Sequence, residues 1–159
     1  MNQTNNAGTS TADREIVAER LLKAPRELVF QVWTNPEHLA RWWGPRGFTI
    51  TTAEMDVRPG GVWRFVMHGP DGVDYPNRIL YLEIVKPERL VYLHSSEDEP
   101  EHFRVTVNFY AEGGQTRLTM QMLFDSAAER EEVVARFNAV QGLNQTLDRL
   151  GELLATVEA

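Results

Sequence analysis

Residues 33–44 read Trp33-Thr34-Asn35-Pro36-Glu37-His38-Leu39-Ala40-Arg41-Trp42-Trp43-Gly44, and they hold three of the chain's four tryptophans. An Asn-Pro pair is typical of a helix start, because the Asn35 side chain can cap the helix and Pro36 has the backbone angle of a first helical residue. Glu37 suits the positive end of such a helix. The stretch therefore predicts a short helix from Pro36 to about Trp42. Its tryptophans indicate either the wall of an apolar chamber or an ordinary core.

The segment before this helix predicts a strand and a first short helix. Residues 16–22 read as a strand, although their alternation is imperfect. Pro25 then occupies the position of a first helical residue. The residues after it place four apolar side chains on one face at helical spacing: Leu28, Val29, Val32 and Trp33. Two short helices are thus expected between the first strand and the rest of the sheet.

The segment from Phe48 to Phe124 reads as about six antiparallel strands. Its short apolar runs are separated by the turn sequences Pro59-Gly60-Gly61, Gly69-Pro70-Asp71-Gly72, Lys86-Pro87-Glu88 and Glu112-Gly113-Gly114-Gln115. Three runs alternate clearly and place apolar residues on one face: Trp63, Phe65 and Met67; Phe103, Val105, Val107 and Phe109; Leu118, Met120, Met122 and Phe124. Residues 79–85 are apolar on both faces, so alternation does not assign their inward side.

The C-terminal segment predicts one long helix. Ser126-Ala127-Ala128-Glu129 is a capping-box sequence, and an apolar stripe follows it: Val133, Phe137, Val140, Leu143, Leu147, Leu150 and Leu154. Such a helix would be about 40 Å long, which is enough to cross a whole sheet. Gly142 and Gly151 lie inside this predicted helix, where a glycine lowers helix stability. Gly142 would either permit a bend or a close contact with the sheet, or would simply be a position where the lower helix stability is tolerated.

The order of these elements predicts an α+β fold. A strand, two short helices, about six antiparallel strands and a terminal helix do not alternate as a doubly wound sheet requires. We expect a curved antiparallel sheet of about seven strands wrapped around the last helix. Bending a sheet around a helix leaves space between them, and such space suits an apolar ligand.

Composition limits the classes of function. The chain has 159 residues, a formal net charge of -7 and no cysteine. This length fits one domain, expected over residues 14–159 after a polar, disordered tail at residues 1–13. The acidic balance argues against nucleic-acid binding, and the lack of cysteine excludes disulfides and thiolate metal sites.

No segment reads as a signal peptide or a membrane span, so we expect a cytoplasmic protein without membrane insertion. The acidic run at residues 97–101 reads as a solvated loop.

Several motifs occur in an order that resembles a known family. They are Trp33-Thr34-Asn35-Pro36-Glu37-His38-Leu39, Trp42-Trp43-Gly44-Pro45, Asp56-Val57-Arg58-Pro59-Gly60-Gly61, Trp63-Arg64-Phe65, Met67-His68-Gly69-Pro70-Asp71-Gly72, Pro87-Glu88-Arg89-Leu90-Val91-Tyr92, Gly113-Gly114-Gln115-Thr116 and Leu147-Asp148-Arg149-Leu150. Together they resemble the activator-of-heat-shock-protein-90-ATPase homologue-like family (AHSA-type), which belongs to the START and birch-pollen-allergen-like (SRPBCC) superfamily. The resemblance spans about residues 14–154.

The resemblance implies a helix-grip fold, in which seven antiparallel strands grip the C-terminal helix around a hydrophobic cavity. In the wider superfamily this cavity binds lipids, sterols, polyketides or other apolar molecules. In the eukaryotic co-chaperone the related module is joined to a separate N-terminal domain that engages the chaperone. We expect this chain to have no room for that domain, and therefore do not expect it to inherit a chaperone-stimulating role.

The inward faces of the strands, together with the tryptophans, predict a set of ligand-binding residues. The set is Trp33, Trp42, Trp43, Phe48, Met55, Trp63, Phe65, Met67, Tyr75, Tyr92, His94, Val105, Val107, Phe109, Leu118, Met120, Met122, Phe137 and Val140. Methionine adapts to irregular space, so its frequency here fits either a pocket tolerant of ligand shape or an unexceptional core.

Acid–base chemistry has only weak candidates. His94 with Tyr92 in an apolar pocket could polarise a carbonyl or move a proton, and Glu54, Asp56, Asp74 and Tyr75 are expected near the mouth of that pocket. No triad spacing supports catalysis, and a histidine in an apolar wall is more often a hydrogen-bonded wall residue.

Metal and cofactor sites are not expected. The other histidines, His38, His68 and His102, lack the spacing that would place ligands on one ion. Residues 44–47 and 60–61 have neither P-loop nor dinucleotide spacing. We therefore predict no metal and no cofactor.

Three functional classes remain. The first is a module that binds an apolar, amphipathic or lipid-like small molecule without chemistry, and it is our preferred hypothesis. The second is a cyclase- or hydrolase-type enzyme acting on an aromatic or polyketide-like ligand in the same cavity. The third is a chaperone-associated or stress-related interaction module that uses the Trp42-Trp43 segment and the acidic run at residues 97–101. A homodimer through a tryptophan-rich edge is also kept open.

Overall fold

The computed structural model describes residues 12–96, 102–137 and 139–156. In these ranges the chain forms a 3-10 helix (Ala12–Arg14) and, in order, β1 (Glu15–Leu22), α1 (Arg26–Thr34), α2 (Pro36–Trp42), β2 (Thr49–Met55), β3 (Val62–His68), β4 (Asp74–Val85), β5 (Arg89–Ser96), β6 (His102–Glu112), β7 (Gln115–Leu123), α3 (Ala127–Phe137) and α4 (Ala139–Leu154). The predicted element order is confirmed up to α3. The 3-10 helix includes two residues of the predicted tail; the rest of that tail and the acidic run at residues 97–101 lie outside the described residues.

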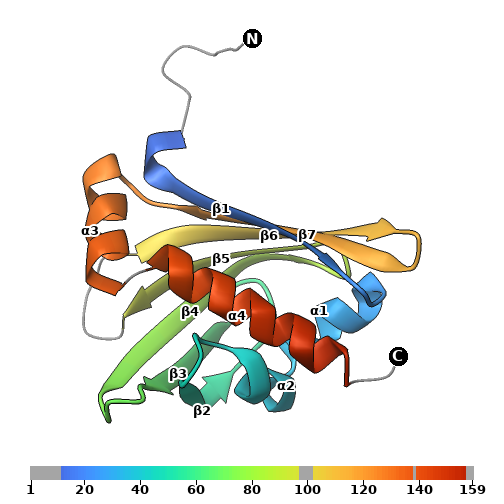
Figure 1. Cartoon of the computed structure of the whole chain (residues 1–159), viewed down its shortest axis with the longest axis horizontal. Helices are drawn as coiled ribbons and strands as arrows, with labels where there is room; N and C mark the ends of the chain where they lie inside the picture. Colours follow the sequence, from blue (N-terminus) through green and yellow to red (C-terminus); the bar gives the residue numbers. More distant parts are fainter. Residues whose placement is uncertain (1–11, 97–101, 138, 157–159) are drawn as a thin grey trace.

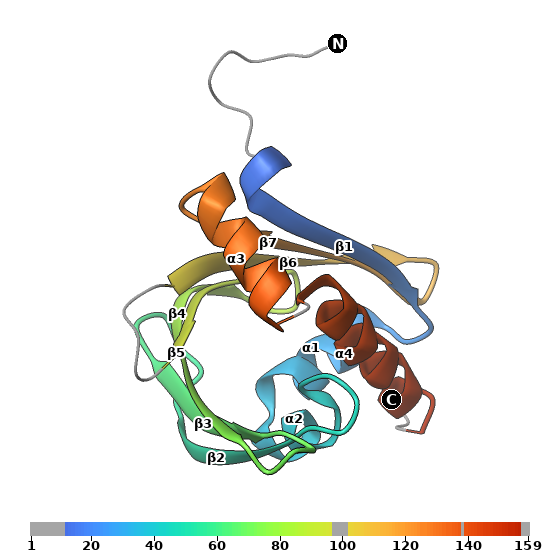
Figure 2. The ribbon, with the colours of Figure 1, turned by 60° about the vertical axis from the view of Figure 1, so that its left-hand side comes forward.

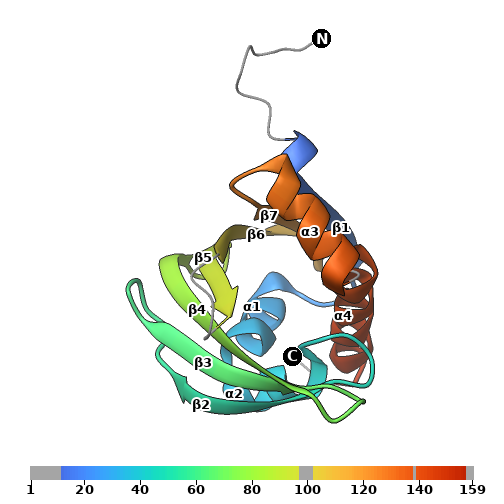
Figure 3. The same cartoon turned by 90° about the vertical axis from the view of Figure 1, so that its left-hand side faces the viewer.

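The seven strands form one antiparallel sheet in the order β1-β7-β6-β5-β4-β3-β2. Each strand from β2 to β7 pairs with its neighbour in sequence, whereas β1 pairs with β7, with Glu15 opposite Leu123. Figures 2 and 3 show the sheet curving around α1 and α2, with α3 and α4 on the open side. The predicted α+β class and the helix-grip arrangement are therefore confirmed. Within the described ranges, no helix combines the length and apolarity needed to cross a bilayer.

The two short helices form where the Pro signals predict them. The backbone N–H of Glu37 donates to the Asn35 side chain at 2.9 Å, which caps α2 at the expected residue. Pro25 precedes α1, whose apolar face of Leu28, Val29 and Val32 is buried. These helices fill one end of the concave face.

A bulge in β4 explains why residues 79–85 are apolar on both faces. Ile79 and Tyr81 are buried on the concave face, and Leu82 is exposed on the convex face. The register against β5 then shifts between Tyr81 and Glu83, which inserts one extra residue in β4. Because of this extra residue, Ile84 also packs against the core. The inward side thus changes parity in the middle of the strand.

The C-terminal helix is divided, contrary to the expectation of one continuous helix. Ser126 caps α3 as expected, since its hydroxyl accepts a hydrogen bond from the backbone N–H of Glu129 at 3.1 Å. A second helix, α4, begins at Ala139, and Figure 1 shows its axis at an angle to that of α3. The helical spacing of the apolar stripe continues through the division, so the pattern gave no sign of it. Gly142, where a bend was considered, lies inside α4.

Gly142 instead lies where α4 approaches the loop after α2. A Cβ atom at this position would be 3.3 Å from Cγ of Pro45. The same loop is bound by Arg149 of α4, whose guanidinium donates to the carbonyl oxygens of Gly44 at 2.9 Å, of Arg41 at 3.1 Å and of Pro45 and Phe48 at 3.2 Å each. Arg149 therefore fastens this loop to the helix that crosses the sheet.

Candidate functional site

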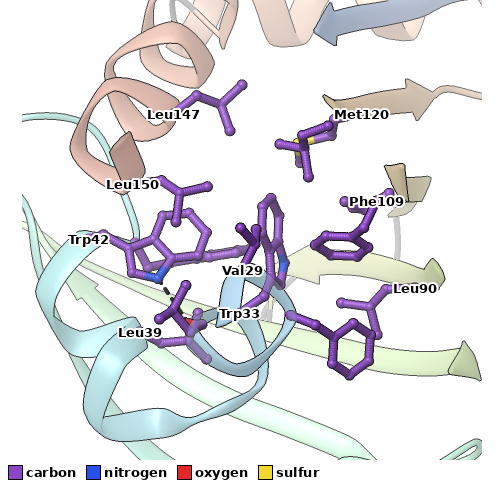
Figure 4. Packing of buried hydrophobic residues seen from close by; sticks show 14 of the residues in the cluster. Val29, Trp33, Leu39, Trp42, Leu90, Phe109, Met120, Leu147 and Leu150 are labelled. Atoms are coloured by element: carbon purple, nitrogen blue, oxygen red, sulfur yellow. Dashed lines mark hydrogen bonds between the residues drawn. The ribbon is translucent and has the colours of Figure 1, made fainter. Parts of the chain in front are cut away.

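The tryptophans form a packed aromatic core at one end of the concave face. Trp33 lies between Trp42 and Phe109, with ring centroids 4.8 and 5.7 Å away, as Figure 4 shows. The Trp42 indole N–H donates to the Val32 carbonyl at 3.0 Å. Trp43 and Trp63 continue the cluster at a centroid distance of 5.0 Å. All four indoles are buried, so the expectation that Trp42-Trp43 or a tryptophan-rich edge offers a surface to a partner is wrong.

Two polar atoms inside this core have no hydrogen-bond partner among the residues that the structure describes. They are the indole nitrogen of Trp33 and the hydroxyl of Tyr92, in side chains that are only 3% and 1% exposed. Burial raises the pKa of Tyr92 well above its usual value, and Tyr81 adds to this rise. The Trp33 indole acts in the opposite direction and lowers the pKa of Tyr92. However, the indole nitrogen of Trp33 and the hydroxyl of Tyr92 do not meet the geometry of a hydrogen bond. The centre of the core thus holds two unsatisfied donors.

Toward the other end of the concave face, half-buried residues are mixed with buried ones such as Phe65 and Ile79. The fully buried residues Leu118, Leu90 and Trp63 lie toward the end that α1 and α2 cover. Near the opposite strand ends, five concave-face residues are only half-buried: Met67, Asn77, His94, Phe103 and Met122. The strand register places His94 opposite Phe103 and places Asn77 opposite Phe65. We call these five residues the His94 end of the concave face.

His94 is held by an amide rather than by a carboxylate. One ring nitrogen, Nε2, lies 2.9 Å from Oδ1 of Asn77. The ring also packs against Phe103 and Phe65, at centroid distances of 5.1 and 6.1 Å. Burial lowers the pKa of His94 to about 4, so the ring is neutral at physiological pH. The His94 ring is therefore packed against apolar groups, while the residue as a whole is only half-buried.

The other predicted ligand-binding residues fall into groups by burial. Phe65, Val105, Val107, Phe109, Leu118 and Met120 are buried in the core. Phe48, Met55 and Tyr75 are half-buried, and the rings of Phe48 and Tyr75 lie 6.1 Å apart. Val140 is 40% exposed on α4. The side chain of Phe137 lies outside the described residues.

The predicted carboxylates of the pocket mouth lie on exposed positions and have arginine or histidine partners. Asp56 binds Arg58 at 2.7 Å and Glu54 lies 3.5 Å from Arg64. Asp74 binds Nδ1 of His68 at 2.8 Å. The structure does not bring these carboxylates to His94, whose hydrogen-bond partner is Asn77.

Sequence reasoning missed a hydrogen-bonded chain across β2, β3 and β4. Nε2 of His68 lies 2.8 Å from the Thr51 hydroxyl, and Nδ1 lies 2.8 Å from the Asp74 carboxylate. This order of groups resembles a hydrolase triad. However, the three residues lie on the solvent-exposed face of the sheet, where no apolar wall would hold a substrate. Only the strand register reveals this chain, because the residues are far apart in the sequence.

A surface groove of about 560 Å³ lies between β1 and α4. Arg20, Leu21, Leu22, Arg46, Leu147, Asp148, Gly151, Glu152 and Ala155 line it. Its charges already form pairs, since Arg20 binds Asp148 at 2.7 Å and Arg46 binds Glu152. The groove is open to solvent.

Comparison with known proteins identifies relatives over most of the chain. The model of the family described as Activator of Hsp90 ATPase homolog 1-like protein matches residues 23–155. A crystal structure of a Nitrosomonas europaea protein is 26% identical, with a TM-score of 0.82, over 91% of this chain and 96% of that one. A Rhizobium leguminosarum protein is 30% identical, with a TM-score of 0.67, over 90% and 95% of the two chains. A solution structure from Arthrobacter aurescens shares the fold at 22% identity, with a TM-score of 0.84 over 94% and 90%. The search of curated proteins gives no significant match.

Proposed function

Because the chain belongs to the Activator of Hsp90 ATPase homolog 1-like family, we propose that it is a small-molecule binding module that holds an apolar or amphipathic ligand at the His94 end of the concave face. The fold and the family agree with a ligand-binding module. The ligand would lie between the curved sheet and the C-terminal helices, beyond the tryptophan core.

The observation that carries this proposal is the environment of His94. Its ring contacts Phe65 and Phe103, and burial lowers its pKa to about 4, yet the residue as a whole is only half-buried. We infer that the accessible surface of His94 faces the space in which the ligand would bind. Met67, Phe103 and Met122 are half-buried on the same face, which gives that space an apolar and adaptable wall.

Binding without chemistry fits His94 better than acid–base catalysis does. An efficient general base has a pKa near the working pH, whereas burial lowers the pKa of His94 to about 4. A catalytic histidine is also usually oriented by a carboxylate, and His94 is oriented by the Asn77 amide. We therefore place the enzyme hypothesis second.

Native mass spectrometry of the full chain purified from its host tests the proposal. We expect a defined small molecule to co-purify, with extracted host lipids as the comparison. Met122→Trp, which fills the His94 end, should reduce its occupancy at least tenfold. Val17→Trp is the matched control, because Val17 is 60% exposed on the convex face of β1. An empty protein, or equal occupancy in Met122→Trp and the wild type, would contradict the proposal.

A further inference from the structure

The side chain of Asn77 is fixed in one orientation. Its Nδ2 donates to the backbone carbonyl of Tyr75 at 2.8 Å, and a carbonyl oxygen can only accept. The amide oxygen of Asn77 must therefore be the atom that faces His94, as the 2.9 Å contact has it. Because an amide oxygen also only accepts, Nε2 of His94 carries the hydrogen of this bond.

This bond determines the chemistry of the other ring nitrogen. A neutral imidazole has one N–H and one lone pair, so Nδ1 of His94 is a hydrogen-bond acceptor. Among the described residues, none donates to Nδ1; Asn77 is the hydrogen-bond partner of the ring, through Nε2. The ring neighbours Phe65 and Phe103 are apolar, and Asn77 carries no charge. The His94 end thus offers one neutral acceptor in an apolar wall.

We propose that the ligand is a neutral molecule with an apolar body and a hydroxyl or N–H group that donates to Nδ1 of His94. This inference rests on the proposed function and narrows the ligand class. A hydroxyl can satisfy the lone pair of Nδ1, whereas a carboxylate has only lone pairs to present and would lose its hydration in an apolar site. The site therefore selects alcohols, phenols or amides over fatty or aromatic acids.

Two aromatic probes of similar size test this selection: 2-naphthol and 2-naphthoate. At pH 7.5 we expect the full chain to bind 2-naphthol at least tenfold more tightly, as measured by calorimetry or by probe fluorescence. His94→Phe keeps a ring of similar size without an acceptor, and its affinity for 2-naphthol should fall toward that for 2-naphthoate. Circular dichroism checks that the variant is folded.

Asn77→Asp provides the second and sharper test. A carboxylate at this position would accept from Nε2 and stabilise the protonated ring, so that Nδ1 would become a donor. The preference should then shift at least tenfold toward 2-naphthoate. Asn108→Asp adds the same charge on the convex face of β6, opposite Arg89, and should leave the preference unchanged.

Different results would contradict the selection at His94 and the binding of a ligand as such. Equal binding of both probes to the wild type, or a preference that His94→Phe and Asn77→Asp leave unchanged, would overturn the selection at His94 but leave a binding module. No binding of either probe, together with no co-purifying molecule, would overturn the proposed function itself.

Discussion

Nη1 of Arg149 lies 2.9 Å from the carbonyl oxygen of Gly44, and this bond joins α4 to the loop after α2. The same nitrogen also contacts the carbonyl oxygens of Pro45 and Phe48. A planar guanidinium has five N–H donors in a fixed arrangement, which suits several carbonyls that converge from one loop. The loop thus depends on a single side chain for much of its connection to α4.

Replacing this side chain should destabilise the protein more than its partial exposure suggests. We expect Arg149→Leu to lower the free energy of unfolding by about 2–4 kcal/mol, because several loop carbonyls lose a charged donor. Arg149→Lys should be more stable than Arg149→Leu but less stable than the wild type, since an ammonium cannot reach the same set of acceptors as a guanidinium. Arg46→Leu, which breaks the exposed pair with Glu152, is the control and should cost less than about 1 kcal/mol. Urea denaturation followed by tryptophan fluorescence measures the free energy of unfolding of all three variants. Equal losses of this free energy in Arg149→Leu and Arg46→Leu would contradict the special role of Arg149 in holding the loop to α4.

The two glycines of α4 should respond differently to alanine. A Cβ at Gly151 meets nothing within 4 Å, so Gly151→Ala should raise the free energy of unfolding by about 0.5–1 kcal/mol through helix propensity. A Cβ at Gly142 would lie 3.3 Å from Pro45 Cγ, so Gly142→Ala should gain less or lose stability. Thermal unfolding of the two variants in parallel tests this, and an equal gain would show that Pro45 moves aside freely.

Removing the unpartnered hydroxyl of Tyr92 should stabilise the core. A buried donor without an acceptor costs about 1–3 kcal/mol, and phenylalanine keeps the ring. We expect Tyr92→Phe to raise the free energy of unfolding by about 1 kcal/mol in urea denaturation. Tyr110→Phe is the control, because Tyr110 is 52% exposed. A loss of stability in Tyr92→Phe would mean that the hydroxyl has a partner in solution.

Burial of His94 should make stability depend on pH. The pKa of His94 is about 4 in the folded protein and about 6.5 when the chain is unfolded. As the pH falls, His94 is therefore protonated in the unfolded state at a higher pH than in the folded state. The free energy of unfolding therefore keeps the full contribution of neutral His94 above about pH 6.5 and loses it as the pH falls toward 4. The slope of this loss is at most about 1.4 kcal/mol per pH unit. Urea denaturation between pH 4.5 and 7.5 should show this slope in the wild type and a smaller one in His94→Phe. Identical slopes would mean that His94 is not buried in its neutral form.

The fold was largely predictable because its signals are local. The caps at Asn35 and Ser126 act within three residues, and both helices begin where these residues predict. Strand faces followed from alternation, which correctly placed Tyr92 inside. Alternation could not assign residues 79–85, because the inserted residue in β4 changes which parity faces inward.

The site was less predictable because its polar contacts cross between elements. Sequence patterns placed His94 on the inward face, but its partner Asn77 lies 17 positions earlier on another strand. Only the register of β4 against β5 brings them together. The contact of Arg149 with the loop is more distant still, since Gly44 lies 105 positions away. Backbone carbonyls have no sequence signature, so such a contact has no pattern to find.

The pairing of β1 with β7 has a consequence for synthesis of the chain. As the polypeptide emerges from the ribosome, β3 to β7 can each dock on the strand made just before, whereas β1 must wait until residues 115–123 have appeared. Such long-range pairing slows folding and leaves a strand temporarily free to join a neighbouring nascent chain. Glu15, Glu19 and Arg20 interrupt the apolar residues of β1, and charged residues at such positions oppose aggregation of a strand that waits for its partner.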